Sequence, residues 1–152
     1  MKKEWIIEII SALLVGIFIY AATSKIFNFP LFVAQLHTHP YLKSFAGIIA
    51  WIVPATELLI SLLLLLPTTR KGGLYGSAAL LIVFTVYLCL MLLSGKPLPC
   101  SCGGFISLLN WRQHVVFNLV LILFAIIGIR LYGNKKSYYK ISNRKKKSVR
   151  AV

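Results

Sequence analysis

Two cysteines separated by a single residue, Cys100 and Cys102, are the side chains of this sequence best suited to chemistry. Such a pair can form a disulfide when the backbone turns, because the Cα atoms then approach within the ~4.4–6.8 Å that the bond needs. Pro99, Gly103 and Gly104 flank the pair and favour a turn. A disulfide closing so small a ring is strained, and strained disulfides exchange readily with other thiols. The pattern favours thiol–disulfide exchange, with Cys100 as the attacking thiolate and Cys102 as the resolving thiol.

Basic residues near the pair favour the thiolate form that exchange requires. Lys96, Arg112 and His114 lie on either side of the two cysteines, and His114 is a candidate site residue for this reason. The positive N-terminal end of the helix expected from residue 114 acts in the same direction. The alternative is that both cysteines are ordinary small residues of a glycine-rich loop, or a structural clip within it.

A metal-binding interpretation is a second alternative. His37 and His39 lie in another connection expected on the same side of the membrane, so that they could converge with Cys100, Cys102 and His114. Zinc and copper(I) accept thiolate and imidazole ligands. The spacings match no strong zinc signature, however, and we predict no metal ligand among these residues.

Glu57 is the most unusual polar residue, because it interrupts an otherwise apolar stretch. An ionisable group inside a membrane is costly and faces the bundle interior or a hydrated cavity. Its functional interpretation is a proton relay, or a partner for a bound head group. The alternative is a protonated carboxyl that hydrogen-bonds to Thr56, to Thr85 or to a carbonyl freed by Pro54.

Two further residues receive structural interpretations. Lys25 lies at the end of the first apolar stretch, from where its side chain can snorkel to the interface. Cys89 is expected to be a packing residue within the third stretch.

The elements that carry these residues follow from hydropathy. The chain has 152 residues, of which 59% are hydrophobic and only 13% charged, and its mean hydropathy is +0.83. A helix crosses the hydrocarbon in ~20 apolar residues, and open strands would leave their backbone groups unsatisfied there. We therefore predict an all-α membrane protein, a four-transmembrane-helix bundle formed by residues 1–132. The spans are expected at about 5–27, 45–66, 74–93 and 114–132, and proline and glycine mark the connections.

The distribution of lysine and arginine predicts the orientation, since cytoplasmic segments carry the excess of these residues. An N-terminus in the cytoplasm places 13 of the 17 basic residues inside and leaves Lys25, Lys43, Lys96 and Arg112 outside. Both termini are then cytoplasmic, and residues 133–152 form a basic cytoplasmic tail. We expect this tail to attract anionic lipids. We do not expect it to bind nucleic acid, because no aromatic and basic binding module accompanies the charge.

Three motifs resemble the MauE/DoxX family of redox-associated membrane proteins. They are Ala22-Thr-Ser-Lys25-Ile-Phe-Asn-Phe in the first span, Pro54-Ala-Thr-Glu57-Leu in the second, and Pro99-Cys100-Ser-Cys102-Gly-Gly-Phe105 followed by Trp111, His114 and Asn118. The last is similar to the methylamine-utilisation branch, MauE. The resemblance implies a four-helix bundle in the bacterial inner membrane that assists thiol–disulfide chemistry beside a periplasmic thioredoxin-like protein. Its DoxX side implies a membrane quinone as cofactor, although the chain shows no separate signature for a quinone site.

Residues and resemblance together predict an inner-membrane thiol–disulfide redox protein, a candidate oxidoreductase, that supports disulfide formation or maturation of periplasmic proteins. Its predicted site consists of Cys100, Cys102, His114 and Glu57. The alternatives are a non-catalytic membrane scaffold for a thioredoxin-like partner and a metal-binding membrane protein.

Overall fold

The computed structural model describes residues 2–37, 42–93 and 111–149, and these segments contain helices and no strand. Their order is α1 (Lys2–Phe27), α2 (Phe29–His37), the 3-10 helix η1 (Lys43–Phe45), α3 (Ala46–Leu65), α4 (Arg70–Leu93) and α5 (Trp111–Val149). Four segments are long and apolar enough to cross a membrane: Glu4–Phe27, Lys43–Leu65, Arg70–Leu90 and Arg112–Gly133. The predicted all-α fold with four spans is confirmed.

The turn between α3 and α4 is shorter than the sequence suggested. The Arg70 amide donates to the Leu66 carbonyl at 2.9 Å, and α4 begins at that residue. Gly72 and Gly73 were expected in the connection but lie in the first turn of α4. At Gly73 the helices pass so closely that a Cβ atom would lie 2.9 Å from the backbone nitrogen of Leu64. A residue without a side chain therefore permits this tight hairpin.

A short helix that the hydropathy pattern did not predict, α2, occupies part of the first connection. Pro30 suggested a break there, but a proline is tolerated in the first turn of a helix, where its missing N–H has no partner to lose. The amide of Phe32 donates to the carbonyl of Asn28 at 3.0 Å, which joins α2 closely to α1. Buried Leu36 of α2 packs with Ala46 and Ala50, so that α2 covers the beginning of α3.

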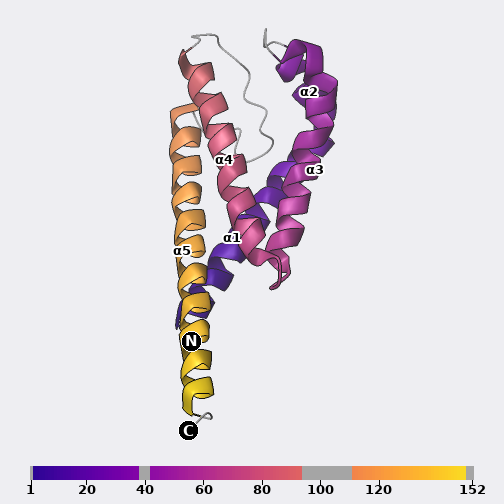
Figure 1. The fold of residues 1–152 in the computed structure, drawn as a ribbon. Helices are drawn as coiled ribbons and strands as arrows, with labels where there is room; N and C mark the ends of the chain where they lie inside the picture. Colours follow the sequence, from indigo (N-terminus) through magenta and orange to yellow (C-terminus); the bar gives the residue numbers. More distant parts are fainter. Residues whose placement is uncertain (1, 38–41, 94–110, 150–152) are drawn as a thin grey trace.

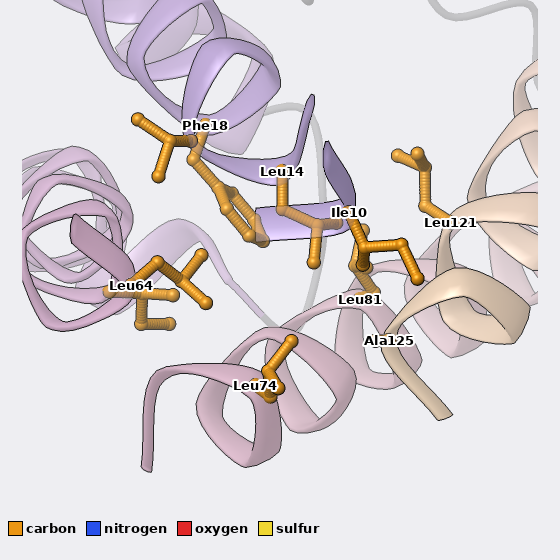
Figure 2. Packing of buried hydrophobic residues seen from close by; sticks show 10 residues of the cluster. Ile10, Leu14, Phe18, Leu64, Leu74, Leu81, Leu121 and Ala125 are labelled. Carbon is orange, nitrogen blue, oxygen red and sulfur yellow. The ribbon is translucent and has the colours of Figure 1, made fainter. Parts of the chain in front are cut away.

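The helix α1 forms the centre of the bundle. In Figure 1 it crosses obliquely behind the other spans, from α5 near its N-terminal end toward α2 and α3 at its C-terminal end. Figure 2 shows the resulting core, in which the α1 side chains meet residues of all three other spans. The core comprises Ile10, Leu14, Val15, Phe18, Ile60, Leu64, Leu74, Leu81, Leu121 and Ala125.

The outer surface of the four spans is apolar. Trp5, Trp51, Leu59 and Val83 are among many large hydrophobic side chains that are exposed, as suits a surface covered by lipid. Cys89 also lies on this surface, so the expectation that it packs inside the bundle is wrong.

The last helix, α5, extends well past its membrane span. Its candidate span ends at Gly133, but the helix continues to Val149. Most of the predicted basic tail is therefore a continuation of the fourth helix. The N-terminus and this extension lie toward the same end of the molecule in Figure 1.

Candidate functional site

An ion pair between α1 and α3 lies inside the bundle. Lys25 Nζ is 2.7 Å from Glu57 Oε1, with 7% of Lys25 and none of Glu57 exposed. The expectation that Lys25 snorkels to the interface is wrong, because its ammonium turns inward to the carboxylate. A buried charge is costly to leave unpaired, so each of these two residues can be buried because the other neutralises its charge.

Two weaker contacts complete the surroundings of the Lys25 ammonium. It donates to the carbonyl of Ala21, one turn earlier in α1, at 3.4 Å. It also lies over the ring of Phe84 in α4, 5.6 Å from the ring centroid, within the range of a cation–π interaction. Groups from α1, α3 and α4 thus hold this ammonium in one place.

Glu57 uses only one of its two carboxylate oxygens. Oε1 accepts from Lys25, whereas Oε2 is buried without a hydrogen-bond partner. The suggested hydroxyl partners are occupied elsewhere: Thr56 donates to the carbonyl of Ile52 at 2.8 Å and Thr85 to that of Leu81 at 2.7 Å. The interpretation of Glu57 as a carboxyl held by these threonines is therefore wrong. Its partner comes from another helix.

His114 lies in the first turn of α5 and points into the bundle. Only 7% of the residue is exposed, which places the imidazole away from the surface. Its Nδ1 atom is buried and, like Glu57 Oε2, has no hydrogen-bond partner. The Lys25 ammonium lies within electrostatic range of this ring. Asn118 is buried one turn further along the same face of α5.

Lys25, Glu57 and His114 are buried polar residues of three spans, and we refer to them as the cluster. The Phe84 ring of the remaining span lies over the Lys25 ammonium, and His114 lies within electrostatic range of that ammonium. The cluster lies toward the end of the bundle where α4 ends and α5 begins. Cys100 and Cys102 belong to the connection between these two helices, and they lie outside the described residues. Cys102 precedes His114 by twelve residues in the sequence, so the cysteine connection leads directly to the cluster.

The metal alternative gains no support from the described residues. Among them, no three histidine, cysteine, aspartate or glutamate side chains gather as metal ligands would. His37 ends α2 with an exposed side chain, whereas His114 is buried. His39 and the two cysteines of the suggested ligand set lie outside the described residues.

Lys25 is the cluster residue that the sequence analysis missed. The signal was present, because an embedded carboxylate predicts an embedded cation, and Lys25 is the basic residue closest to the interior of the first span. The obstacle was depth. Glu57 lies eleven residues after the start of α3, whereas Lys25 lies two residues from the end of α1. If these two helix ends lay at the same depth in the membrane, the two side chains would be at different depths and could not meet.

The sequence matches a known family over most of its length. Residues 3–131 match the family model of the methylamine utilisation protein MauE. The chain belongs to the MauE family. No curated protein and no solved structure matches it significantly. The MauE match spans all four membrane helices and includes Lys25, Glu57 and His114, while most of the helical extension after the last span lies beyond it. Membership of the MauE family and the four apolar helices are consistent with a redox-associated role in a membrane.

Proposed function

We propose that this MauE-family protein exchanges disulfides between its Cys100–Cys102 pair and a periplasmic thioredoxin-like protein, in the bacterial inner membrane. The observation that carries the proposal is the buried Lys25–Glu57–His114 cluster, located where the connection bearing both cysteines joins the bundle. Thiol exchange needs groups that accept and return protons, and this cluster offers two unpartnered atoms. On the proposed orientation, both termini are cytoplasmic and the basic extension of α5 contacts anionic lipids.

The exchange itself proceeds in two displacement steps. The thiolate of Cys100 attacks one sulfur of the partner disulfide, which forms a mixed disulfide and releases one partner thiolate. The thiolate of Cys102 then attacks the Cys100 sulfur, which closes the Cys100–Cys102 disulfide and releases the second partner thiolate. Two electrons pass to the partner, and the two protons lost by the cysteines end on its thiols.

The same steps in reverse oxidise a partner dithiol and leave Cys100 and Cys102 reduced. Reoxidation of the pair then requires a two-electron acceptor. A membrane quinone, if bound here, would supply that capacity for electrons and protons. The oxygens of such a ring need hydrogen-bonding groups in an apolar environment, and Glu57 Oε2 and His114 Nδ1 are of the right chemical type. These two residues would be its contacts once the bundle opened to admit the ring, because Glu57 is fully buried.

The cluster contributes to exchange through proton transfer. Each cysteine must lose a proton before it attacks, and a positioned acid or base typically accelerates such a step by ~10²–10⁴-fold. His114 is the closer of the two candidate groups in sequence to the cysteines, and Glu57 offers a second position in the same cluster. His114 and Glu57 therefore act as proton acceptors in this proposal.

A trapping experiment tests the exchange directly. In a Cys102→Ser variant the first mixed disulfide cannot be resolved, so a thioredoxin-like protein should remain attached to Cys100 on a non-reducing gel. Dithiothreitol should release it. Cys100→Ser should trap far less, and Cys89→Ser, which removes the exposed thiol of α4, should leave trapping unchanged.

The opposite result would favour the scaffold alternative. Absence of any reductant-sensitive adduct in the Cys102→Ser variant, together with normal partner binding by a Cys100→Ser/Cys102→Ser double variant, would show that the protein holds its partner without exchanging disulfides.

A further inference from the structure

Two buried side-chain atoms remain without a hydrogen-bond partner in the described residues, and both belong to the same cluster. They are Glu57 Oε2 in α3 and His114 Nδ1 in α5. A buried polar atom without a partner costs free energy, so most such atoms in proteins are paired. Glu57 Oε2 belongs to the carboxylate that Lys25 binds, and the His114 ring lies within electrostatic range of the same ammonium, so each of the two atoms is free to accept a proton.

The Lys25 ammonium interacts with both residues but forms no hydrogen bond with either of the two unpartnered atoms. It binds Glu57 through Oε1 at 2.7 Å and lies within electrostatic range of the His114 ring. The Ala21 carbonyl and the Phe84 ring fix its remaining sides. The ammonium therefore holds the carboxylate through Oε1 and leaves Oε2 without a hydrogen-bond partner.

We propose that Lys25, Glu57 and His114 form one unit that takes up a single proton, at Glu57 Oε2 or His114 Nδ1, with Lys25 as its positioning residue. This inference rests on the proposed function, because the proton comes from a cysteine thiol as it becomes a thiolate. A proton needs no cavity, so a fully buried carboxylate can receive it without opening of the bundle.

The charges of the unit explain why it takes up one proton rather than two. The positive Lys25 and the negative Glu57 cancel. One added proton leaves a single positive charge, which a newly formed thiolate balances. A second proton would add another positive charge close to the first, in surroundings of low polarity where repulsion is strong. Besides Lys25 and Glu57, the Phe84 ring of α4 lies over the ammonium. On α5 itself, exposed Arg112 precedes His114 by two residues and buried Asn118 follows it by four.

The first test asks whether Lys25 controls the charge of Glu57. Infrared spectra of the full-length protein in lipid nanodiscs would be compared for the wild type, Lys25→Arg, Lys25→Met and Lys25→Met/Glu57→Gln. In the oxidised protein, a protonated-carboxyl band should be absent in the wild type and in Lys25→Arg. It should appear in Lys25→Met, because a buried carboxylate without its partner becomes neutral. The band should be lost again in the double variant, which identifies it as Glu57.

The second test follows the proton itself. The infrared difference between the oxidised and reduced protein should show one protonation change at the imidazole or the carboxyl, assigned with His114→Gln and Glu57→Gln. Lys25→Arg should retain this change. The Lys25→Met/Glu57→Gln/His114→Gln variant, which lacks both acceptor atoms and leaves no charge unpaired, should lose it while keeping its thermal unfolding transition. A purely structural role of these residues would not predict that result.

Two results would overturn the proposal. One is a carboxyl band that does not depend on Lys25, and the other is an unchanged redox-linked proton signal in the variant that lacks both acceptor atoms. The first test also works in a Cys100→Ser/Cys102→Ser background. A Lys25-dependent band there, without exchange activity in the wild type, would refute the proposed function and leave the charge control by Lys25 intact.

Discussion

The Lys25–Glu57 pair joins two helices at a place where neither residue is stable alone. Both charged groups are withdrawn from solvent, with the ammonium 2.7 Å from the carboxylate. Removal of one member of a buried ion pair typically costs about 3–5 kcal/mol, whereas replacement of both members by neutral residues of similar volume is often nearly neutral. The two situations can be separated by experiment.

We predict that Lys25→Met lowers the free energy of unfolding by about 3–5 kcal/mol, because Glu57 loses its partner. The Lys25→Met/Glu57→Gln double variant should recover most of this loss. Denaturant unfolding of the two single variants and the double variant in detergent measures the coupling. Additive losses in the double variant would show that the two residues do not depend on each other.

At the cysteines, the prediction concerns the redox potential. Cys100 and Cys102 should form an internal disulfide that dithiothreitol removes readily, with a potential above the limit of about −300 mV typical of structural bridges. Titration against a dithiothreitol couple, read out by thiol labelling, measures this potential. A pair that stays reduced in isolated membranes with one metal ion bound per chain would support the metal alternative instead.

At the scale of elements, the contact between α3 and α4 depends on Gly73. A Cβ atom there would lie 2.9 Å from the Leu64 nitrogen, whereas one at neighbouring Gly72 would meet nothing within 4 Å. We predict that Gly73→Ala destabilises the protein by about 1–3 kcal/mol through overpacking. The matched Gly72→Ala variant should be neutral or slightly stabilising, because alanine favours the helix. Thermal unfolding in detergent compares them, and equal midpoints would contradict the close approach.

The elements also show what the sequence could and could not predict. Apolar length placed four spans, because bilayer thickness imposes the same length on each of them. Helix α2 was missed because Pro30 was interpreted as a break, although it occupies a first helical turn. The start of α4 was placed late because Gly72 and Gly73 signalled a loop, whereas Gly73 serves close packing.

The sequence predicted two residues of the cluster but not the neighbour that they share. Composition identified Glu57 and His114 as unusual polar residues, and both prove to be buried. Whether Lys25 meets these residues depends on how far α1 extends along α3, and no local sequence pattern encodes that tertiary geometry. The packing of α1 across the bundle decides it (Figure 1).

For the whole molecule, the orientation in the membrane is the next prediction. The bias of 13 basic residues against four predicts cytoplasmic termini and cysteines that face the periplasm. In a Cys89→Ser background, a membrane-impermeant maleimide should label Cys100 or Cys102 in intact cells with a permeabilised outer membrane, after mild reduction. Labelling only after disruption of the inner membrane would reverse the orientation.

The rate of disulfide exchange tests the central claim most directly. Full-length protein in lipid nanodiscs would be mixed with oxidised thioredoxin, and the mixed and internal disulfides followed by acid quenching. We predict exchange in the wild type, none in Cys100→Ser/Cys102→Ser, and rates lower by about 100-fold or more in His114→Gln and Glu57→Gln, because proton transfer is impaired. Ser11→Ala should retain the full rate, because its hydroxyl bonds only the Ile7 carbonyl, at 2.8 Å. Wild-type rates in folded His114 and Glu57 variants would contradict a role of the buried cluster in the exchange.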